Sequence, residues 1–371
     1  MKRTGLVLAA LGLFLFCQAA QAQWTPAKRI SWTAGASYYG KIAVDSFGTL
    51  HVVWYDFGDD GDRIFYKKST NGGITWTPSR CLVWAGELDI PDIAVDSYDN
   101  VHVFWSDDTP PGGSFISYKK STDGGATWKA TRSITWGTYA KYPEIIADSS
   151  TNLYMTYEDG ITGEYVPYYK KSTDSGATWL PRRAWAFGRS LSVDPSGCLH
   201  VVWGDSSPGN QEVYYKKSTN GGNTWTAPRR LTWTAGGSKG PEISIDSSGQ
   251  LHVLWCDNTP GHYEYYYKKS TDGGNIWTSA KRVTWGLNVF GYLTLASDPS
   301  HILHAVWVSG ASGNHELYYK NTGGAATQRL TWNSGASDGP DLVTDPSGNL
   351  HVVWYDDTPG NREIYYKKRM N

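Results

Sequence analysis

LHVLWCDNTPGHYEYYYKKSTDGGNIW, residues 251–277, is the clearest copy of a unit that this chain repeats. Its opening pentapeptide recurs at intervals of 46 to 52 residues, beginning at Leu50, Val101, Leu153, Leu199, Leu251, Leu303 and Leu350. A period near 50 residues is typical of proteins built from one supersecondary unit used many times. The sequence therefore predicts seven similar units.

Each unit contains four short segments with the composition of β-strands. In the fifth unit they are ISID (243–246), LHVLW (251–255), EYYYKKS (264–270) and RVTW (282–285). β-Branched and aromatic residues dominate them, and Gly, Pro, Asp and Asn separate them. No segment has a helical period. We therefore predict an all-β fold, a seven-bladed β-propeller of four-stranded blades.

The two ends of the chain complement each other. The last unit stops at Arg369, just after its third strand, and QWTPAKRISW (23–32) reads as a fourth strand without the preceding three. We predict that residues 24–32 complete the last blade and close the ring, so that residues 23–371 form one domain. Closure would leave no unpaired edge strand at the junction.

The first 22 residues read as a secretory signal peptide. Lys2 and Arg3 precede an apolar run from Leu6 to Phe16, and Ala20-Gln21-Ala22 resembles a cleavage site. We therefore expect a secreted, periplasmic or cell-surface protein without membrane insertion. The mature chain keeps Cys81, Cys198 and Cys256, whose spacing suggests neither a metal site nor a disulfide framework.

An octet follows the third strand of most units. STDGGATW (121–128) has near-copies at Ser69, Ser172, Ser218 and Ser270, and a decayed copy, NTGGAATQ, at Asn321. The Asp or Asn suits backbone amides in a tight turn, Gly allows positive φ, and Trp packs inward. We interpret the octet as structural, through Asn71, Trp76, Asp123, Trp128, Asp174, Trp179, Asn220, Trp225, Asp272 and Trp277.

The octet resembles the Asp-box, Ser-x-Asp-x-Gly-x-x-Trp, of sialidase-like β-propellers. The resemblance covers the mature chain as repeats, and it implies that the box lies at the periphery between the third and fourth strands. It also implies an exo-sialidase activity with three clamping arginines and a Tyr nucleophile assisted by Glu. Lys41 stands where the family's first arginine is expected, which counts against that activity.

Other residues recur once per unit. Each pentapeptide except the third has His second: His51, His102, His200, His252, His304 and His351. An arginine appears on each fourth strand: Arg29, Arg80, Arg132, Arg183, Arg230, Arg282 and Arg329. A feature that recurs once per blade around a ring cannot build one asymmetric site, so both sets are interpreted as structural. All 19 tryptophans also fall in repeated positions, and we expect them to fill the wedges between blades.

One position near the start of each first strand should face the central channel mouth. It holds Lys41, Asp92, Glu144, Ser190, Glu242, Thr294 and Asp341, and Arg189 lies beside it. Four carboxylates and one amine would suit a cation, a basic group or sugar hydroxyls, and the alternative is a solvated polar rim. Crowded carboxylates would raise the pKa of at least one of them.

Three functions remain open. We favour a non-catalytic propeller that binds a glycan or a surface protein through its variable loops, with fourth-strand tryptophans as possible sugar platforms. The alternatives are an exo-sialidase-type hydrolase and a structural or adhesion module. The formal net charge of −1 favours no nucleic-acid partner. We expect a monomer with no metal and no cofactor.

Overall fold

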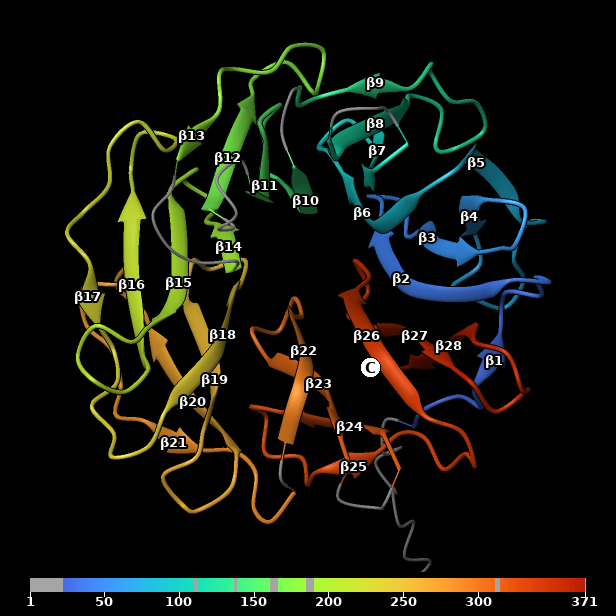
Figure 1. Cartoon of the computed structure of the whole chain (residues 1–371). Helices are drawn as coiled ribbons and strands as arrows, with labels where there is room; N and C mark the ends of the chain where they lie inside the picture. Colours follow the sequence, from blue (N-terminus) through green and yellow to red (C-terminus); the bar gives the residue numbers. More distant parts are fainter. Residues whose placement is uncertain are drawn as a thin grey trace, which may run out of the picture.

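The computed structural model describes residues 23–109, 113–136, 139–160, 166–184, 190–287, 289–310 and 314–370. Within them, 28 strands form seven four-stranded antiparallel sheets arranged as a ring (Figure 1). The prediction of a seven-bladed β-propeller is confirmed. The signal-peptide prediction, residues 1–22, lies outside the described residues.

The blades are numbered from the first complete sheet. Blade 1 contains β2 to β5, blades 2 to 6 follow in order, and blade 7 contains β26, β27, β28 and β1. The innermost strands, which surround the axis, are β2 (Ala36–Val44), β6 (Leu88–Val95), β10 (Ala140–Ala147), β14 (Ser190–Val193), β18 (Ser238–Ile245), β22 (Val289–Ser297) and β26 (Ser337–Thr344). The second strands are β3 (Leu50–Phe57), β7 (Val101–Asp107), β11 (Leu153–Asp159), β15 (Leu199–Asp205), β19 (Leu251–Asp257), β23 (Leu303–Ser309) and β27 (Leu350–Asp356).

The outer half of each blade is less regular. The third strands are β4 (Asp62–Ser69), β8 (Phe115–Ser121), β12 (Val166–Ser172), β16 (Glu212–Ser218), β20 (Glu264–Ser270), β24 (Glu316–Asn321) and β28 (Glu363–Arg369). The fourth strands are short except in blade 1: β5 (Arg80–Ala85), β9 (Arg132–Ser133), β13 (Arg183–Ala184), β17 (Arg229–Arg230), β21 (Lys281–Arg282), β25 (Gln328–Arg329) and β1 (Lys28–Arg29). Blade 6 keeps all four strands although its octet has decayed.

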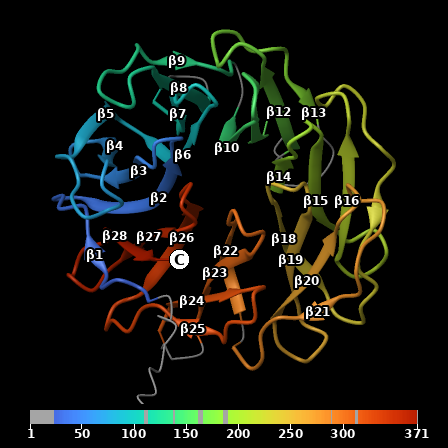
Figure 2. The same ribbon diagram turned by 180° about the vertical axis from the view of Figure 1, so that it is seen from behind.

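The N-terminal strand closes the ring as predicted. β1 pairs antiparallel with β28, with Lys28 opposite Tyr366 and Arg29 opposite Tyr365. The N–H of Ile30 donates to the Ile364 carbonyl at 2.8 Å, and the Ile30 side chain is buried. Figure 2 shows β1 beside β28, at the junction of the first and last blades.

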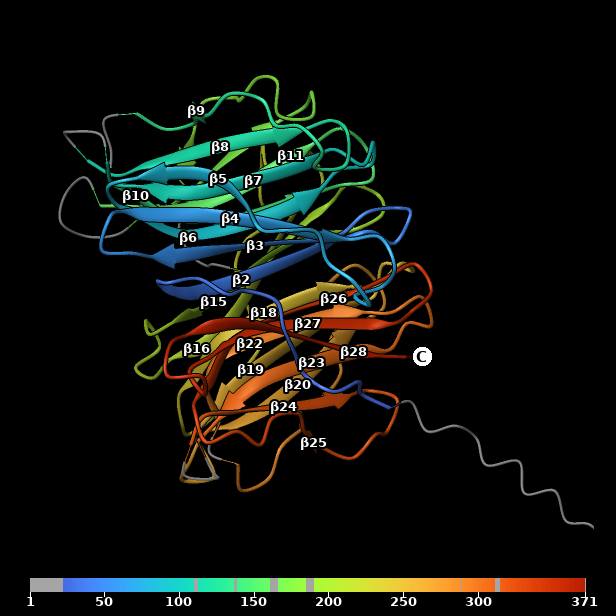
Figure 3. The same cartoon turned by 90° about the vertical axis from the view of Figure 1, so that its right-hand side faces the viewer.

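The two faces of the ring carry different connections (Figure 3). The turn face holds the turns from first to second strand, such as residues 46–49, and the octet turns, such as residues 70–79. The loop face holds the connections from second to third strand and from each blade to the next, such as residues 58–61 and 86–87.

The core consists mainly of the second strands. Their tryptophans are buried: Trp54, Trp105, Trp203, Trp255, Trp307 and Trp354. The octet tryptophans pack between blades, as Trp128 does edge-on against Tyr66 of the preceding blade at 5.0 Å between ring centroids. These two sets fill the wedges as expected.

Cys81, Cys198 and Cys256 are free thiols. In the part of the chain that the structure describes, no helix is long and apolar enough to cross a membrane.

Candidate functional site at the loop-face end of the channel

The predicted channel residues form one level around the axis. Each lies three residues before the last residue of its innermost strand, so they lie deeper than the mouth at which we expected them. They are Lys41, Asp92, Glu144, Ser190, Glu242, Thr294 and Asp341. We call this set the polar ring. Arg189 lies outside the described residues.

Several polar-ring side chains tie neighbouring innermost strands together. The N–H of Ile42 donates to Asp341 Oδ2 at 2.8 Å across the closure between blades 7 and 1. Ile145 donates to Asp92 in the same way at 2.7 Å. Since each acceptor belongs to the blade before its donor, these contacts hold adjacent blades together at the axis.

The polar ring is electrostatically coupled around Lys41. Burial opposes the charge of Lys41, but four nearby carboxylates outweigh it and raise the pKa of the ammonium. They belong to Asp341, Asp92, Glu144 and Glu242. Burial raises the pKa of Asp92 to about 6, although Lys41 acts in the opposite direction. In the described residues no group of acidic, His or Cys side chains has metal-binding geometry.

A second level lies closer to the loop face, two residues before the polar ring. The pairing of six innermost strands with their second strands is irregular just before the polar ring, as in a β-bulge. This bulge level holds Tyr39, Ile90, Tyr142, Gly240, Tyr292 and Gly339. Four of these residues have a left-handed backbone: Tyr39 (φ 49°), Tyr142 (φ 57°), Gly240 (φ 51°) and Gly339 (φ 57°).

Glycine adopts this backbone conformation without a steric cost, whereas tyrosine does not. A non-glycine residue there costs on the order of 1–2 kcal/mol. Gly240 and Gly339 show that the repeat can place glycine at this level, yet Tyr39 and Tyr142 occupy it in blades 1 and 3. Strain that the fold does not require is characteristic of functional positions.

The bulge-level tyrosines interact with one another and with an acid. Tyr39 shares a side-chain hydrogen bond with Tyr292 and lies near Tyr142 and Asp89. Burial, followed by Tyr292 and Asp89, raises the pKa of Tyr39 to about 12. The phenol of Tyr39 is therefore neutral at physiological pH and can exchange hydrogen bonds with hydroxyl groups.

Further aromatic and charged groups surround this cluster. Tyr38 and Tyr355 lie with ring centroids 5.6 Å apart, and the Arg362 guanidinium lies over both rings at 4.8 and 5.6 Å. Lys141, next to Tyr142, pairs with Asp108 Oδ2 at 2.7 Å. Oδ1 of Asp108 is buried and has no hydrogen-bond donor among the described residues.

The sequence analysis missed the bulge level. The available signal was the presence of Tyr in three blades and Gly in two others at the position two residues before the polar ring. Reading it would have required knowing that a bulge sets positive φ there. We call Tyr39, Tyr142, Tyr292, Asp89 and Asp108 the mouth cluster.

The fourth-strand tryptophans contradict our expectation that every tryptophan fills a wedge. Six of them have exposed fractions between 61% and 70%: Trp32, Trp84, Trp136, Trp233, Trp285 and Trp332. Trp185 lies outside the described residues. In blades 2 and 4 to 7 the fourth strand ends three residues before this tryptophan, whereas in blade 1 Trp84 lies inside β5. In each of these blades the indole is exposed and does not fill a wedge between blades.

The octet residues lie in the turns between third and fourth strands, away from the mouth. In blade 2, Ser121 Oγ accepts from the Gly125 N–H at 2.8 Å, and Asp123 accepts from the Thr127 N–H at 2.8 Å. Asn71 replaces Asp in blade 1 and accepts from Thr75 at 2.9 Å. The carboxylate is therefore used as a turn acceptor, which an amide oxygen can replace.

The repeated histidines are buried structural groups. His51 lies 2.7 Å from Tyr66 Oη through Nδ1 and 3.3 Å from Asp45 through Nε2. The bond to tyrosine recurs at His102, His200, His252, His304 and His351. Burial lowers the pKa of His102, so its ring is neutral at pH 7.

The repeated arginines form two rows and not the single row that we expected. Arg29, Arg230, Arg282 and Arg329 pair with a buried Glu of the third strand in blades 4 to 7. Arg80, Arg132 and Arg183 lie one residue earlier in register and donate to octet-turn carbonyls of the next blade. Each row is spread over several blades and contacts protein groups, so neither converges on one asymmetric site.

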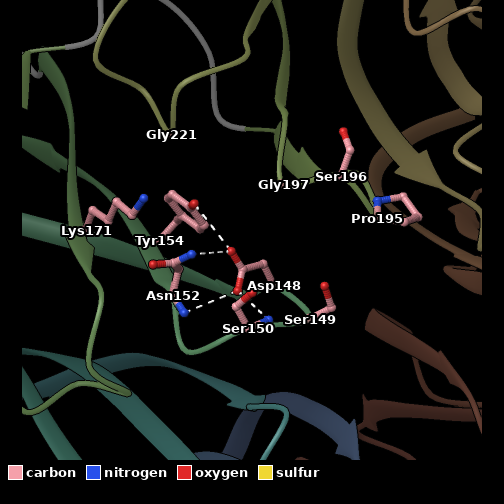
Figure 4. A pocket seen from close by; sticks show the side chains of 10 residues that line it. All are labelled: Asp148, Ser149, Ser150, Asn152, Tyr154, Lys171, Pro195, Ser196, Gly197 and Gly221. Carbon is pink, nitrogen blue, oxygen red and sulfur yellow. Dashed lines mark hydrogen bonds between the residues drawn. The ribbon is translucent and has the colours of Figure 1, made fainter.

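A hollow of about 240 Å³ opens between turns of blades 3 and 4 on the turn face (Figure 4). Blade 3 has Tyr154 where other blades have His, and Tyr154 and Asn152 both donate to Asp148 Oδ2, at 3.5 and 2.6 Å. Because these polar groups satisfy one another, the hollow is a weaker candidate site than the mouth cluster.

No family model and no curated protein matches this chain. Its fold is similar to solved structures at low identity. An ulvan lyase of polysaccharide lyase family 25, bound to a glucuronate–sulfated rhamnose fragment, is 11% identical with a TM-score of 0.63, covering 91% of this chain and 95% of that one. A protein of unknown function from Dyadobacter fermentans is 14% identical with a TM-score of 0.56, covering 92% and 97%.

The sialidase of Trypanosoma rangeli is 12% identical with a TM-score of 0.53 and covers 93% of this chain. This chain spans 60% of that sialidase. At these identities the similarity establishes the propeller fold.

Proposed function

We propose that this protein is an exported, non-catalytic propeller that binds a glycan at the loop-face end of its channel. The observation that carries the proposal is the strained backbone of Tyr39 and Tyr142 at positions where blades 5 and 7 have glycine. Such strain persists when the side chain does something that glycine cannot do.

The chemistry of the mouth cluster suits a sugar. Tyrosine rings offer flat apolar surface with a polar tip, and carboxylates accept hydrogen bonds from hydroxyls. The buried Oδ1 of Asp108 has no protein donor among the described residues, so a ligand hydroxyl would satisfy it. Propellers of similar fold that act on carbohydrates are consistent with this ligand class.

The same cluster fits sialidase catalysis poorly. A sialidase clamps a carboxylate with three guanidinium groups. Among the described residues of the mouth, Arg362 lies over Tyr38 and Tyr355, while the polar ring beneath is rich in carboxylates. A tyrosine pKa of about 12 also makes Tyr39 a poor nucleophile at neutral pH.

The test is a glycan array probed with the mature chain, followed by calorimetry with the best oligosaccharide. We expect Tyr39→Gly and Tyr142→Gly to lose binding while remaining folded. Tyr98→Ala is the matched control, because Tyr98 is exposed on the turn face. Hydrolysis of a fluorogenic sialoside, or formation of an unsaturated uronide from a polysaccharide, would contradict the non-catalytic proposal. Failure to bind any glycan would favour the structural or adhesion alternative.

A further inference from the structure

An exposed indole is held rigidly at the rim of blade 5. Glu264 is fully buried and accepts from Arg282 at 3.0 Å. It also accepts from the Thr284 hydroxyl and the Gly286 N–H, the residues on either side of Trp285. One carboxylate therefore fixes the chain before and after a tryptophan whose side chain faces solvent.

The same clamp recurs in neighbouring blades. The buried glutamates Glu212, Glu316 and Glu363 accept from Arg230, Arg329 and Arg29, and from the hydroxyls of Thr232, Thr331 and Ser31. Each hydroxyl residue directly precedes its tryptophan. We call Trp233, Trp285, Trp332 and Trp32, in blades 4, 5, 6 and 7, the clamped tryptophans.

The fold does not need these clamps. By register, the glutamate is replaced by Arg63, Phe115 and Val166 in blades 1 to 3, and the arginine by Cys81, Ser133 and Ala184. These blades still form four-stranded sheets. Burying a carboxylate, and holding an indole in water, both cost free energy, so the clamp is better explained by presentation of the indole than by folding.

A lysine of the next blade lies against each clamped tryptophan. The Nζ atoms of Lys268, Lys320, Lys367 and Lys67 lie 5.7, 4.9, 5.5 and 5.1 Å from the ring centroids. Each donates to a backbone carbonyl at 2.6 Å, and no carboxylate contact is found for them among the described residues. Lys67 and Lys367 are at least nine-tenths buried.

We propose that the clamped tryptophans are binding platforms for an acidic polysaccharide. A sugar ring would stack on the exposed indole, and its carboxylate or sulfate would be attracted by the ammonium, which is partly exposed at Lys268 and Lys320 and buried at Lys67 and Lys367. Within each clamp the charge of the arginine is balanced by its glutamate, whereas the lysine beside the indole is hydrogen-bonded to a backbone carbonyl. Four platforms on adjacent blades would bind one polymer with avidity. This site is separate from the mouth cluster and does not depend on it.

Affinity gel electrophoresis tests the proposal with three embedded polymers: polygalacturonate, dextran sulfate and neutral dextran. We expect the acidic polymers to retard the protein and dextran to leave its mobility unchanged, with the two acidic arms distinguishing uronate from sulfate. Trp285→Ala should weaken binding by roughly fivefold to tenfold. The triple Trp233→Ala, Trp285→Ala, Trp332→Ala variant should lose roughly 100-fold or more.

Two controls separate platform binding from general effects. Trp84→Ala removes an equally exposed indole from blade 1, which lacks the clamp, and should leave retardation unchanged. Lys320→Gln keeps a donor for the Val283 carbonyl and should reduce binding to acidic polymers. Equal retardation by dextran, equal loss in Trp84→Ala, or no retardation by either acidic polymer would overturn the proposal.

Discussion

At the scale of single residues, two tyrosines of the bulge level have a strained backbone that folding does not require. Tyr142 has a φ of 57° and leaves 36% of its surface exposed, so its strained side chain is only partly buried. Gly240 and Gly339 adopt similar angles without strain. The tyrosines are the residues whose replacement should separate stability from binding.

We predict that Tyr142→Gly leaves the free energy of unfolding unchanged or raises it by about 1 kcal/mol, because glycine relieves the left-handed strain. Urea denaturation of both proteins measures the change. A loss above about 2 kcal/mol would show that Tyr142 packs as a structural residue.

The polar ring gives a prediction about pH. Asp92 has a pKa of about 6 in the folded protein, above its ordinary value of 3.8, so the folded state binds more protons between these values. Its contribution to stability therefore falls as the pH rises from about 4 to about 6. Asp92→Asn removes this loss and keeps an oxygen for the Ile145 N–H.

We expect Asp92→Asn to be more stable than the wild type by roughly 1–2 kcal/mol above pH 6, allowing for screening by channel water, and equal to it near pH 4. Urea midpoints across this pH range measure the difference. Asp59→Asn, an exposed change in the loop after β3, is the control. A constant difference at all pH values would contradict the shifted pKa.

At the scale of elements, Glu264 and Arg282 form the ion pair of the blade 5 clamp, and a blade has either both partners or neither. Blade 3 has Val166 and Ala184 in the places of Glu264 and Arg282. Removing one partner of a buried ion pair leaves an uncompensated charge, whereas removing both does not.

We predict that Arg282→Ala costs about 3 kcal/mol or more, because Glu264 stays buried without its guanidinium. Adding Glu264→Val should recover much of that cost. A double-mutant cycle by chemical denaturation measures the coupling. Additive costs would mean that the pair contributes nothing as a unit.

The elements also show how far sequence reasoning reached. Strand number, order and closure followed from the repeat, because four apolar segments per unit leave few other ways to bury their faces. The sequence left the exposure of Trp285 open, because a repeated tryptophan suits both a wedge between blades and a sugar platform. The structure decides it, since β21 ends at Arg282 and leaves the indole exposed. The mouth cluster could not be predicted, because its tyrosines are positioned by a β-bulge. The bulge depends on the register between strands, which the sequence does not specify.

At the scale of the whole molecule, closure by β1 should determine stability. Ile30 is buried and its backbone completes the sheet of blade 7. We predict that Ile30→Ala costs about 2–5 kcal/mol, as large-to-small changes in a core do. Loss of residues 23–32 would leave β28 as an open edge and promote aggregation.

Thermal unfolding and size-exclusion chromatography of both variants measure these effects. Lys28→Ala, which changes an exposed side chain of the same strand, serves as the control. A shortened chain that remained monomeric and as stable as the wild type would show that the ring does not depend on its closing strand.

The most direct test of the account is a crystal structure of the mature protein soaked with the oligosaccharide that it binds most tightly. We predict intact sugar in contact with Tyr39, Tyr142 and Tyr292 at the loop-face mouth. A mouth left empty, even with sugar on the clamped tryptophans, or cleaved sugar in the mouth, would contradict the proposed function.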